Sequence, residues 1–139
     1  MRTDRLLLDT CAVLWTALDA GIADKAEDAM NTSVQSDVDV MVSPITAWEF
    51  GLLEARGRLP TAQPASLLFS EFLARPGIGM EGLTPEILID SSSLPGEFHN
   101  DPADRIIIAT ARALDMIVVT RDRAILRYAK QGYVRALEC

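Results

Sequence analysis

The chain has 139 residues, of which 49% are hydrophobic and 24% are charged. This length supports one domain with its own core, and the apolar content excludes a disordered chain. The formal net charge of −7 argues against nucleic acid as a partner, because phosphate groups are bound by Lys and Arg. We expect a single domain over residues 1–139.

Short apolar runs alternate with longer helical patterns, which is typical of βα units around a parallel sheet. In chain order, the sequence predicts a strand at 5–9, helices at 11–19 and 23–35, a strand at 39–43, helices at 44–56 and 64–74, a strand at 79–83, helices at 84–92 and 102–114, a strand at 116–120, a helix at 122–131 and a strand at 133–137. Ser43, Thr84 and Asp101 each precede a proline, a pattern that marks helix starts. The expected fold class is α/β.

The apolar runs are far too short to span a membrane, and the first of them ends at Asp9, which argues against a signal peptide. The two cysteines, Cys11 and Cys139, form neither a CxxC motif nor a convincing disulfide framework. We therefore expect a cytoplasmic protein with reduced thiols and no contact with a membrane.

Two acids lie just after predicted strands. Asp9 comes directly after the run LLL, and Asp122 comes two residues after Thr120, the last residue of the run IVVT. Because functional groups in open parallel sheets gather at the carboxyl ends of the strands, both acids are expected at the same edge.

Two further acids interrupt apolar helix faces near the helix N-termini. At helical spacing Glu49 shares a face with Ile45, Leu52 and Leu53, and Asp104 shares one with Ile107, Ile108 and Ala111. Each acid therefore points inward, toward the edge that carries Asp9 and Asp122. A structural acid paired with a buried arginine remains an alternative for Glu49.

Four converging carboxylates repel one another, and their pKa values rise unless positive charge is supplied. A bound cation supplies it, and a set of oxygen ligands suits Mg²⁺ or Mn²⁺. A zinc site would normally use His or Cys ligands, but the chain has only one His and two Cys. Hard-cation carboxylate sites are typical of phosphoryl chemistry, so the sequence indicates phosphodiester hydrolysis.

Several neighbouring residues have structural alternatives. Asp101 precedes Pro102 and is expected to cap a helix, with water-mediated metal contact as the minor alternative. Thr10 is interpreted first as a helix cap, and Asp122 could cap the helix that follows it. Thr120 could orient a ligand or a water from the strand end. His99 is expected to be a surface loop residue.

The segments LLLDTCAVLW, SPITAWEFGLL, NDPADRIIIATA and VVTRD resemble the successive acidic motifs of PIN-domain ribonucleases, in particular the VapC toxins of bacterial toxin–antitoxin modules. The resemblance covers almost the whole chain. It implies a three-layer α/β/α sandwich with a mainly parallel sheet of about five strands. It also implies an endoribonuclease site dependent on Mg²⁺ or Mn²⁺, with Asp9, Glu49, Asp104 and Asp122 as the four acids.

The same resemblance implies an RNA substrate, a cognate antitoxin that blocks the site, and a homodimer. Charge is uneven, since residues 105–135 hold seven basic and two acidic side chains. Arg105, Arg121 and Arg123 lie beside the acids and are expected either to guide RNA to the metal or to act as counter-charges within the protein.

Three other functions remain open at this point. A receiver domain also clusters aspartates but needs a lysine at the sheet edge, and Lys25 and Lys130 both fall in predicted helices. A phosphatase related to haloacid dehalogenases would want an aspartate at position 11, where Cys11 stands. A metal-free RNA binder or antitoxin-bound scaffold is the third.

Overall fold

The computed structural model describes residues 4–139, so the predicted domain 1–139 is seen except for residues 1–3. Five strands form one sheet in the order β3-β2-β1-β4-β5, and every neighbouring pair is parallel. The strands are β1 (Leu6–Leu8), β2 (Val40–Val42), β3 (Ile78–Met80), β4 (Ile117–Thr120) and β5 (Arg135–Glu138). The α/β class with a parallel five-stranded sheet is confirmed.

Seven helices connect the strands within the described residues. They are α1 (Thr10–Ala17), α2 (Asp24–Gln35), α3 (Pro44–Ala55), α4 (Ala65–Leu73), α5 (Pro85–Asp90), α6 (Pro102–Leu114) and α7 (Arg123–Lys130). The Xaa-Pro signals mark true helix starts, because Ser43, Thr84 and Asp101 are the N-caps of α3, α5 and α6. Each cap side chain accepts a hydrogen bond from a backbone N–H of the first turn, which that turn would otherwise leave unpaired.

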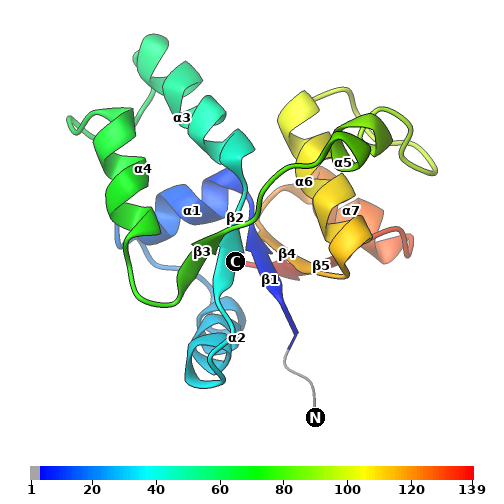
Figure 1. Cartoon of the computed structure of the whole chain (residues 1–139), viewed down its shortest axis with the longest axis horizontal. Coiled ribbons are helices and arrows are strands. Elements are labelled where there is room, and N and C mark those ends of the chain that lie inside the picture. The colour runs from blue at the N-terminus through cyan, green and yellow to red at the C-terminus, as the bar shows by residue number, and fades with distance from the viewer. Residues whose placement is uncertain (1–3) are drawn as a thin grey trace.

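The helices cover both faces of the sheet, with α1, α3 and α4 on one side of Figure 1 and α5, α6 and α7 on the other. Alternation along β1 divides the core in the same way. Leu6 and Leu8 pack into the cluster that contains Phe50 and Phe72, whereas Leu7 packs against Ile107 and Ile108 of α6. Because successive side chains of a strand point to opposite faces, three consecutive leucines supply both core layers.

The central position of β1 decides where its carboxyl end lies. Its neighbours are β2 on one side and β4 on the other, so the chain leaves β1 at the point where the strand order reverses. Ligands in open α/β sheets bind outside the carboxyl ends of the strands at such a point. Within residues 4–139, no helix is both long enough and apolar enough to cross a bilayer.

Candidate active site

Asp9 lies at the carboxyl end of β1 and caps α1. The residue is only 3% exposed, and Oδ1 accepts a hydrogen bond from the Ala12 N–H at 2.8 Å. Oδ2 accepts a second hydrogen bond, from the hydroxyl of Thr120 at the end of β4. Burial raises the pKa of Asp9 from 3.8 to about 6, although both hydrogen bonds oppose the rise. The buried carboxylate is therefore costly to ionise without a cation.

Thr10 is not a helix cap, so that expectation was wrong. Asp9 takes the capping position, and Thr10 is the first residue of α1. Its hydroxyl is then free to donate a hydrogen bond to Oε1 of Glu49, and it lies 3.2 Å from the hydroxyl of Thr46. Thr10 thus connects the start of α1 to α3 and fixes the direction of the Glu49 carboxylate.

Glu49 is half-buried, and the fully buried face of α3 is formed by Thr46 and Phe50. That face is rotated by one residue from the expected one, because the larger Phe50 ring fills the core beside Phe69. Glu49 consequently sits at the border of the core, where it reaches Thr10. Burial first, and then the carboxylates of Asp101 and Asp9, raise its pKa, while the bond from Thr10 opposes the rise.

Asp104 projects from the first turn of α6, on the same face as the buried Ile107 and Ile108. Its side chain is 20% exposed. Burial first, and then the carboxylates of Asp101, Asp122, Glu49 and Asp9 in that order, raise its pKa from 3.8 to about 8. These contributions indicate that Asp104 lies among all the other acids predicted for the site.

Asp101 and Asp122 both begin helices. Asp101 accepts from the Asp104 N–H at 3.1 Å, as the Asp-Pro pattern predicts. Oδ1 of Asp122 accepts from the N–H groups of Ala124 and Ile125 at 2.8 and 3.0 Å, which leaves Oδ2 available to a ligand. Asp122 can therefore cap α7 and bind a cation at the same time.

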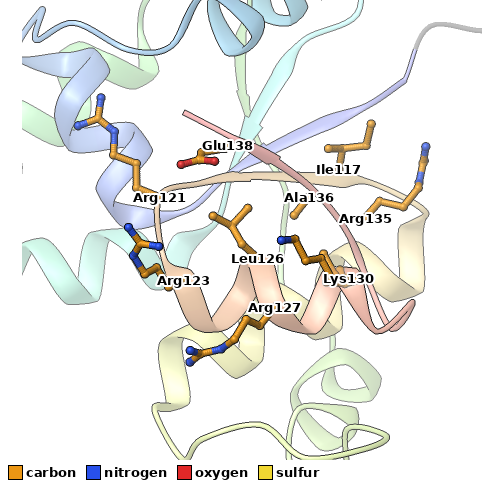
Figure 2. Close-up of a pocket in the computed structure, with 11 residues that line it drawn as sticks. Ile117, Arg121, Arg123, Leu126, Arg127, Lys130, Arg135, Ala136 and Glu138 are labelled. Carbon is orange, nitrogen blue, oxygen red and sulfur yellow. The ribbon is translucent and has the colours of Figure 1, made fainter.

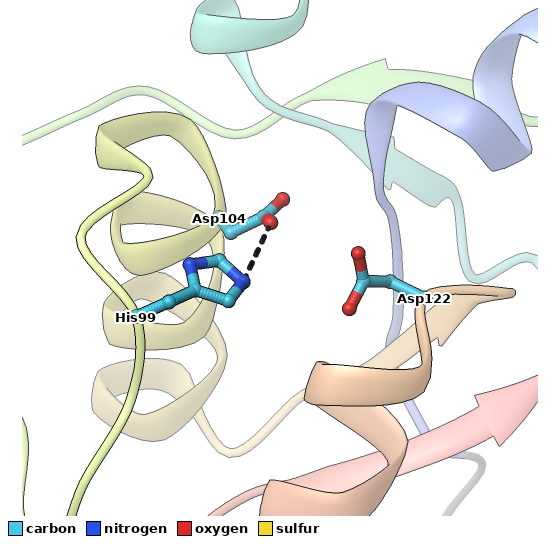
Figure 3. A group of neighbouring side chains, drawn as sticks. All are labelled: His99, Asp104 and Asp122. Carbon is cyan, nitrogen blue, oxygen red and sulfur yellow. Dashed lines mark ion pairs between the residues drawn. The ribbon is translucent and has the colours of Figure 1, made fainter.

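His99 lies in an exposed loop, as the sequence predicts, and its ring also reaches the acids. The side chain is 41% exposed, yet Nε2 lies 3.4 Å from Oδ2 of Asp104, and both groups face Asp122 (Figure 3). One nitrogen of His99 and one oxygen each of Asp104 and Asp122 lie within 4.8 Å of one another, a spacing that a metal ion could span. The sequence feature that could have indicated this position is that His99 lies two residues before Asp101, the N-cap of α6.

The tautomer of His99 limits its role. Its Nδ1 accepts a hydrogen bond from the Asp101 N–H at 3.2 Å. A neutral ring that accepts at Nδ1 carries its proton on Nε2, the atom that faces Asp104. Metal ligation through Nε2 would require the other tautomer, so the carboxylates are the better ligands here.

The oxygen donors fit a hard divalent cation. Burial, and then the carboxylates of Asp9, Glu49, Asp104 and Asp122, raise the pKa of the Cys11 thiol to about 11. The negative field of the four acids therefore converges on one place, beside the start of α1. A divalent cation would neutralise that field, and oxygen ligands suit Mg²⁺ or Mn²⁺.

The three arginines expected to guide RNA differ in their contacts. Arg105 donates to the carbonyl oxygens of Ser91, Phe98 and His99 and so holds the loop before α6. Arg121 donates to the carbonyls of Cys139 and Gly21, and its guanidinium lies 4.5 Å from the ring centre of Trp15. Arg123 is exposed at the start of α7.

An α/β sheet with carboxylates gathered outside β1 and β4 is an arrangement that suits a divalent cation. The chain belongs to the PIN domain family, whose model matches residues 6–131. Ribonuclease VapC22 of Mycobacterium tuberculosis is 29% identical over 118 residues, which cover 85% of this chain and 87% of that relative.

Two solved structures with similar folds illustrate the likeness. VapBC2 of Rickettsia felis, bound to a DNA fragment from its promoter, matches with a TM-score of 0.68 at 12% identity and covers 96% of this chain and 97% of that one. A toxin–antitoxin complex from Klebsiella pneumoniae matches with a TM-score of 0.55 at 18% identity, covering 86% and 89%. At sequence identities of 12% and 18%, these structures show that the fold is shared.

Proposed function

We propose that this protein is a divalent-cation-dependent endoribonuclease and the toxin of a toxin–antitoxin pair. The observation that carries the proposal is that Asp9, Glu49, Asp104 and Asp122, from the ends of β1 and β4 and from α3 and α6, lie close enough for their charges to interact. Burial first, and then repulsion between the carboxylates, opposes ionisation and raises the pKa values of Asp9, Glu49 and Asp104. Such an arrangement is costly for folding alone and is typical of functional sites.

Membership of the PIN domain family and the likeness to a named ribonuclease support this proposal. The partners we propose are an RNA substrate and a cognate antitoxin, by analogy with the toxin–antitoxin complexes of similar fold. We further propose a single domain that forms a homodimer and acts in the cytoplasm.

The cation would be Mg²⁺ or Mn²⁺, with Asp9, Asp104 and Asp122 as ligands and Glu49 completing the set directly or through water. When bound, such a cation activates a water and stabilises charge on the phosphoryl oxygens.

The protein's own groups prepare the site for that cation. Thr120 and Ala12 hold the Asp9 carboxylate in one orientation, and Thr10 does the same for Glu49. The backbone N–H groups at the start of α7 hold Asp122. Burial raises the pKa of Asp104 to about 8, so its carboxyl would have to lose a proton before it could hold a cation near neutral pH.

RNA cleavage with added Mg²⁺ or Mn²⁺ tests the proposal, with Asp104→Asn compared against the unaltered protein. We expect the cleavage rate of the variant to fall by more than about 100-fold. That loss is larger than the one usually seen when a residue that only supports a metal ligand is replaced. Asp28→Asn, on the exposed side of α2, is the matched control and should retain full activity. Equal cleavage by the unaltered protein and Asp104→Asn would refute the assignment.

A further inference from the structure

A groove of about 700 Å³ runs between α7 and the edge strand β5 (Figure 2). Its lining contains five basic side chains and one acidic side chain, Glu138. The basic residues are Arg121, Arg123, Arg127, Lys130 and Arg135. This concentration of positive charge is notable in a chain with a formal net charge of −7.

Two of the five basic side chains already bind other groups of this protein. Arg121 is held by the carbonyls of Cys139 and Gly21, and Arg135 pairs with Asp4 and Asp115 at 3.2 and 3.1 Å. Within residues 4–139, the other three make no ion pair and no side-chain hydrogen bond. Those three are Arg123, Arg127 and Lys130, and all are exposed.

The three free cations form one stripe on α7. Their spacings of four and three residues place them on the same side of the helix, whereas Ile125 and Tyr128 face the core. The stripe is roughly 10 Å long, at 1.5 Å per residue. It begins at Arg123, immediately after Asp122, so one end of the groove adjoins the carboxylate cluster.

We propose that Arg123, Arg127 and Lys130 bind backbone phosphates of the RNA strand on one side of the bond that is cut. This inference rests on the proposed ribonuclease function and assigns a path to its substrate. A polyanion approaching four carboxylates is repelled, so cations beside them are needed to bring it close. Contacts to phosphates position the strand without reading its sequence.

The position of the stripe favours RNA over an acidic peptide. A strand that is cut must pass the carboxylates, and the stripe continues from Asp122 along α7. Leu126 and Ala136, which line the groove between the cations, offer apolar surface to riboses or bases. A peptide bound only to block the groove would have no need of cations that extend away from the cluster.

The experiment measures RNA binding over a range of salt concentrations, with all proteins carrying Asp104→Asn to prevent cleavage. The triple variant Arg123→Gln, Arg127→Gln, Lys130→Gln should bind a single-stranded RNA at least about tenfold more weakly at low salt. The slope of log affinity against log salt should fall by about 2, at roughly 0.7 for each phosphate that is no longer neutralised. The control Lys25→Gln, Arg56→Gln, Arg58→Gln removes the same charges from exposed positions elsewhere and should change neither value.

A second measurement uses proteins with Asp104 intact. The triple variant should raise KM for RNA and leave kcat unchanged, because the stripe does not touch the reacting phosphate. If the triple variant and the control bind RNA equally well, this inference is overturned. The proposed function still stands in that case, provided that the unaltered protein cleaves RNA. Displacement of RNA by poly-glutamate at a lower charge concentration than a competing single-stranded RNA requires would also overturn the inference, in favour of a peptide site. If the unaltered protein neither binds nor cuts RNA, both proposals fail.

Discussion

The hydroxyl of Thr120 donates a hydrogen bond to Oδ2 of Asp9 and thereby joins the carboxyl ends of β4 and β1. The oxygen of that hydroxyl also accepts a hydrogen bond from the N–H of Asp122 at 2.9 Å. One buried side chain therefore orients one acid and holds the backbone of another, although Thr120 and Asp9 are 111 residues apart in the chain.

Replacement of Thr120 by Val keeps the shape of the side chain and removes both hydrogen bonds. We expect the free energy of unfolding to fall by about 1–3 kcal/mol, because a buried carboxyl and an N–H lose their partner. Cation affinity should fall by about 10- to 100-fold, as is usual when a group supporting a metal ligand is lost. Thr120→Ser should recover most of both losses. Denaturant unfolding and calorimetric titration with Mn²⁺ measure the two effects.

The stability of the cation-free protein should fall as pH rises. The folded-state pKa values of Asp9 and Asp104, about 6 and about 8, lie above the ordinary value of 3.8, because both carboxyls are buried. The folded protein then binds more protons than the unfolded chain, so its stability is greatest near pH 4 and falls through pH 8. Asp104→Asn cannot ionise and should raise the unfolding free energy at pH 8 by about 1–3 kcal/mol. Thermal unfolding at pH 5 and pH 8 tests this, and a variant less stable than the parent at pH 8 would contradict it.

Cation binding should strengthen with pH over the same range. Below about pH 8 a cation competes with the proton on Asp104, so the apparent affinity should rise by up to about tenfold per pH unit between pH 6 and pH 8. Proton release measured by calorimetry in two buffers of different ionisation enthalpy should accompany binding. In Asp104→Asn the pH dependence should be much shallower, whatever the remaining affinity.

The tautomer of His99 can be observed directly, because the chain contains one histidine. The bond from the Asp101 N–H to Nδ1 predicts that the neutral ring carries its proton on Nε2. Two-bond ¹⁵N–¹H spectra of histidine-labelled protein above pH 8 should show that tautomer, and Mg²⁺ should not change it. His99→Gln, which lacks every imidazole signal, confirms the assignment. A switch to the Nδ1–H form on adding Mg²⁺ would instead make His99 a metal ligand.

Arg105 should act mainly through the loop that it holds. Arg105→Lys cannot satisfy the carbonyls of Ser91, Phe98 and His99 together, so we expect the unfolding free energy to fall by about 1–2 kcal/mol. The positive charge remains, and the salt dependence of RNA binding should therefore stay the same. Arg58→Lys, at an exposed position, is the control for the substitution itself. A shallower salt dependence of RNA binding, with an unchanged free energy of unfolding, would instead indicate that Arg105 contacts the RNA.

The elements most visible in the sequence are those with strong local signals. The buried strands LLL and IVVT and the three proline-marked helix starts lie where the sequence predicts them. Asp104 could be placed on the buried face of α6 because its helix has a clear apolar stripe.

Other features depend on partners distant in the chain and leave no local pattern. The face of α3 is set by the Phe50 ring packing on Phe69, which rotates the buried stripe away from Glu49. The capping of α1 by Asp9 depends on the backbone direction at the end of β1, so Thr10 was mistaken for the cap. Arg105 fixes the loop that brings His99 to Asp104. It donates to backbone carbonyls, which every residue has, so the side chains of the loop do not reveal these hydrogen bonds.

The pairing of β1 with β4 has a consequence for synthesis of the protein. Leu6 lies beside Ile117, and Asp9 accepts a hydrogen bond from Thr120, so β1 has only β2 beside it until the residues of β4, more than a hundred positions later, have been made. A ribosome-bound fragment that ends before β4 contains Asp9, Glu49 and Asp104 but lacks the strand that gathers them. The carboxylate cluster can therefore assemble only after β4 has been synthesised.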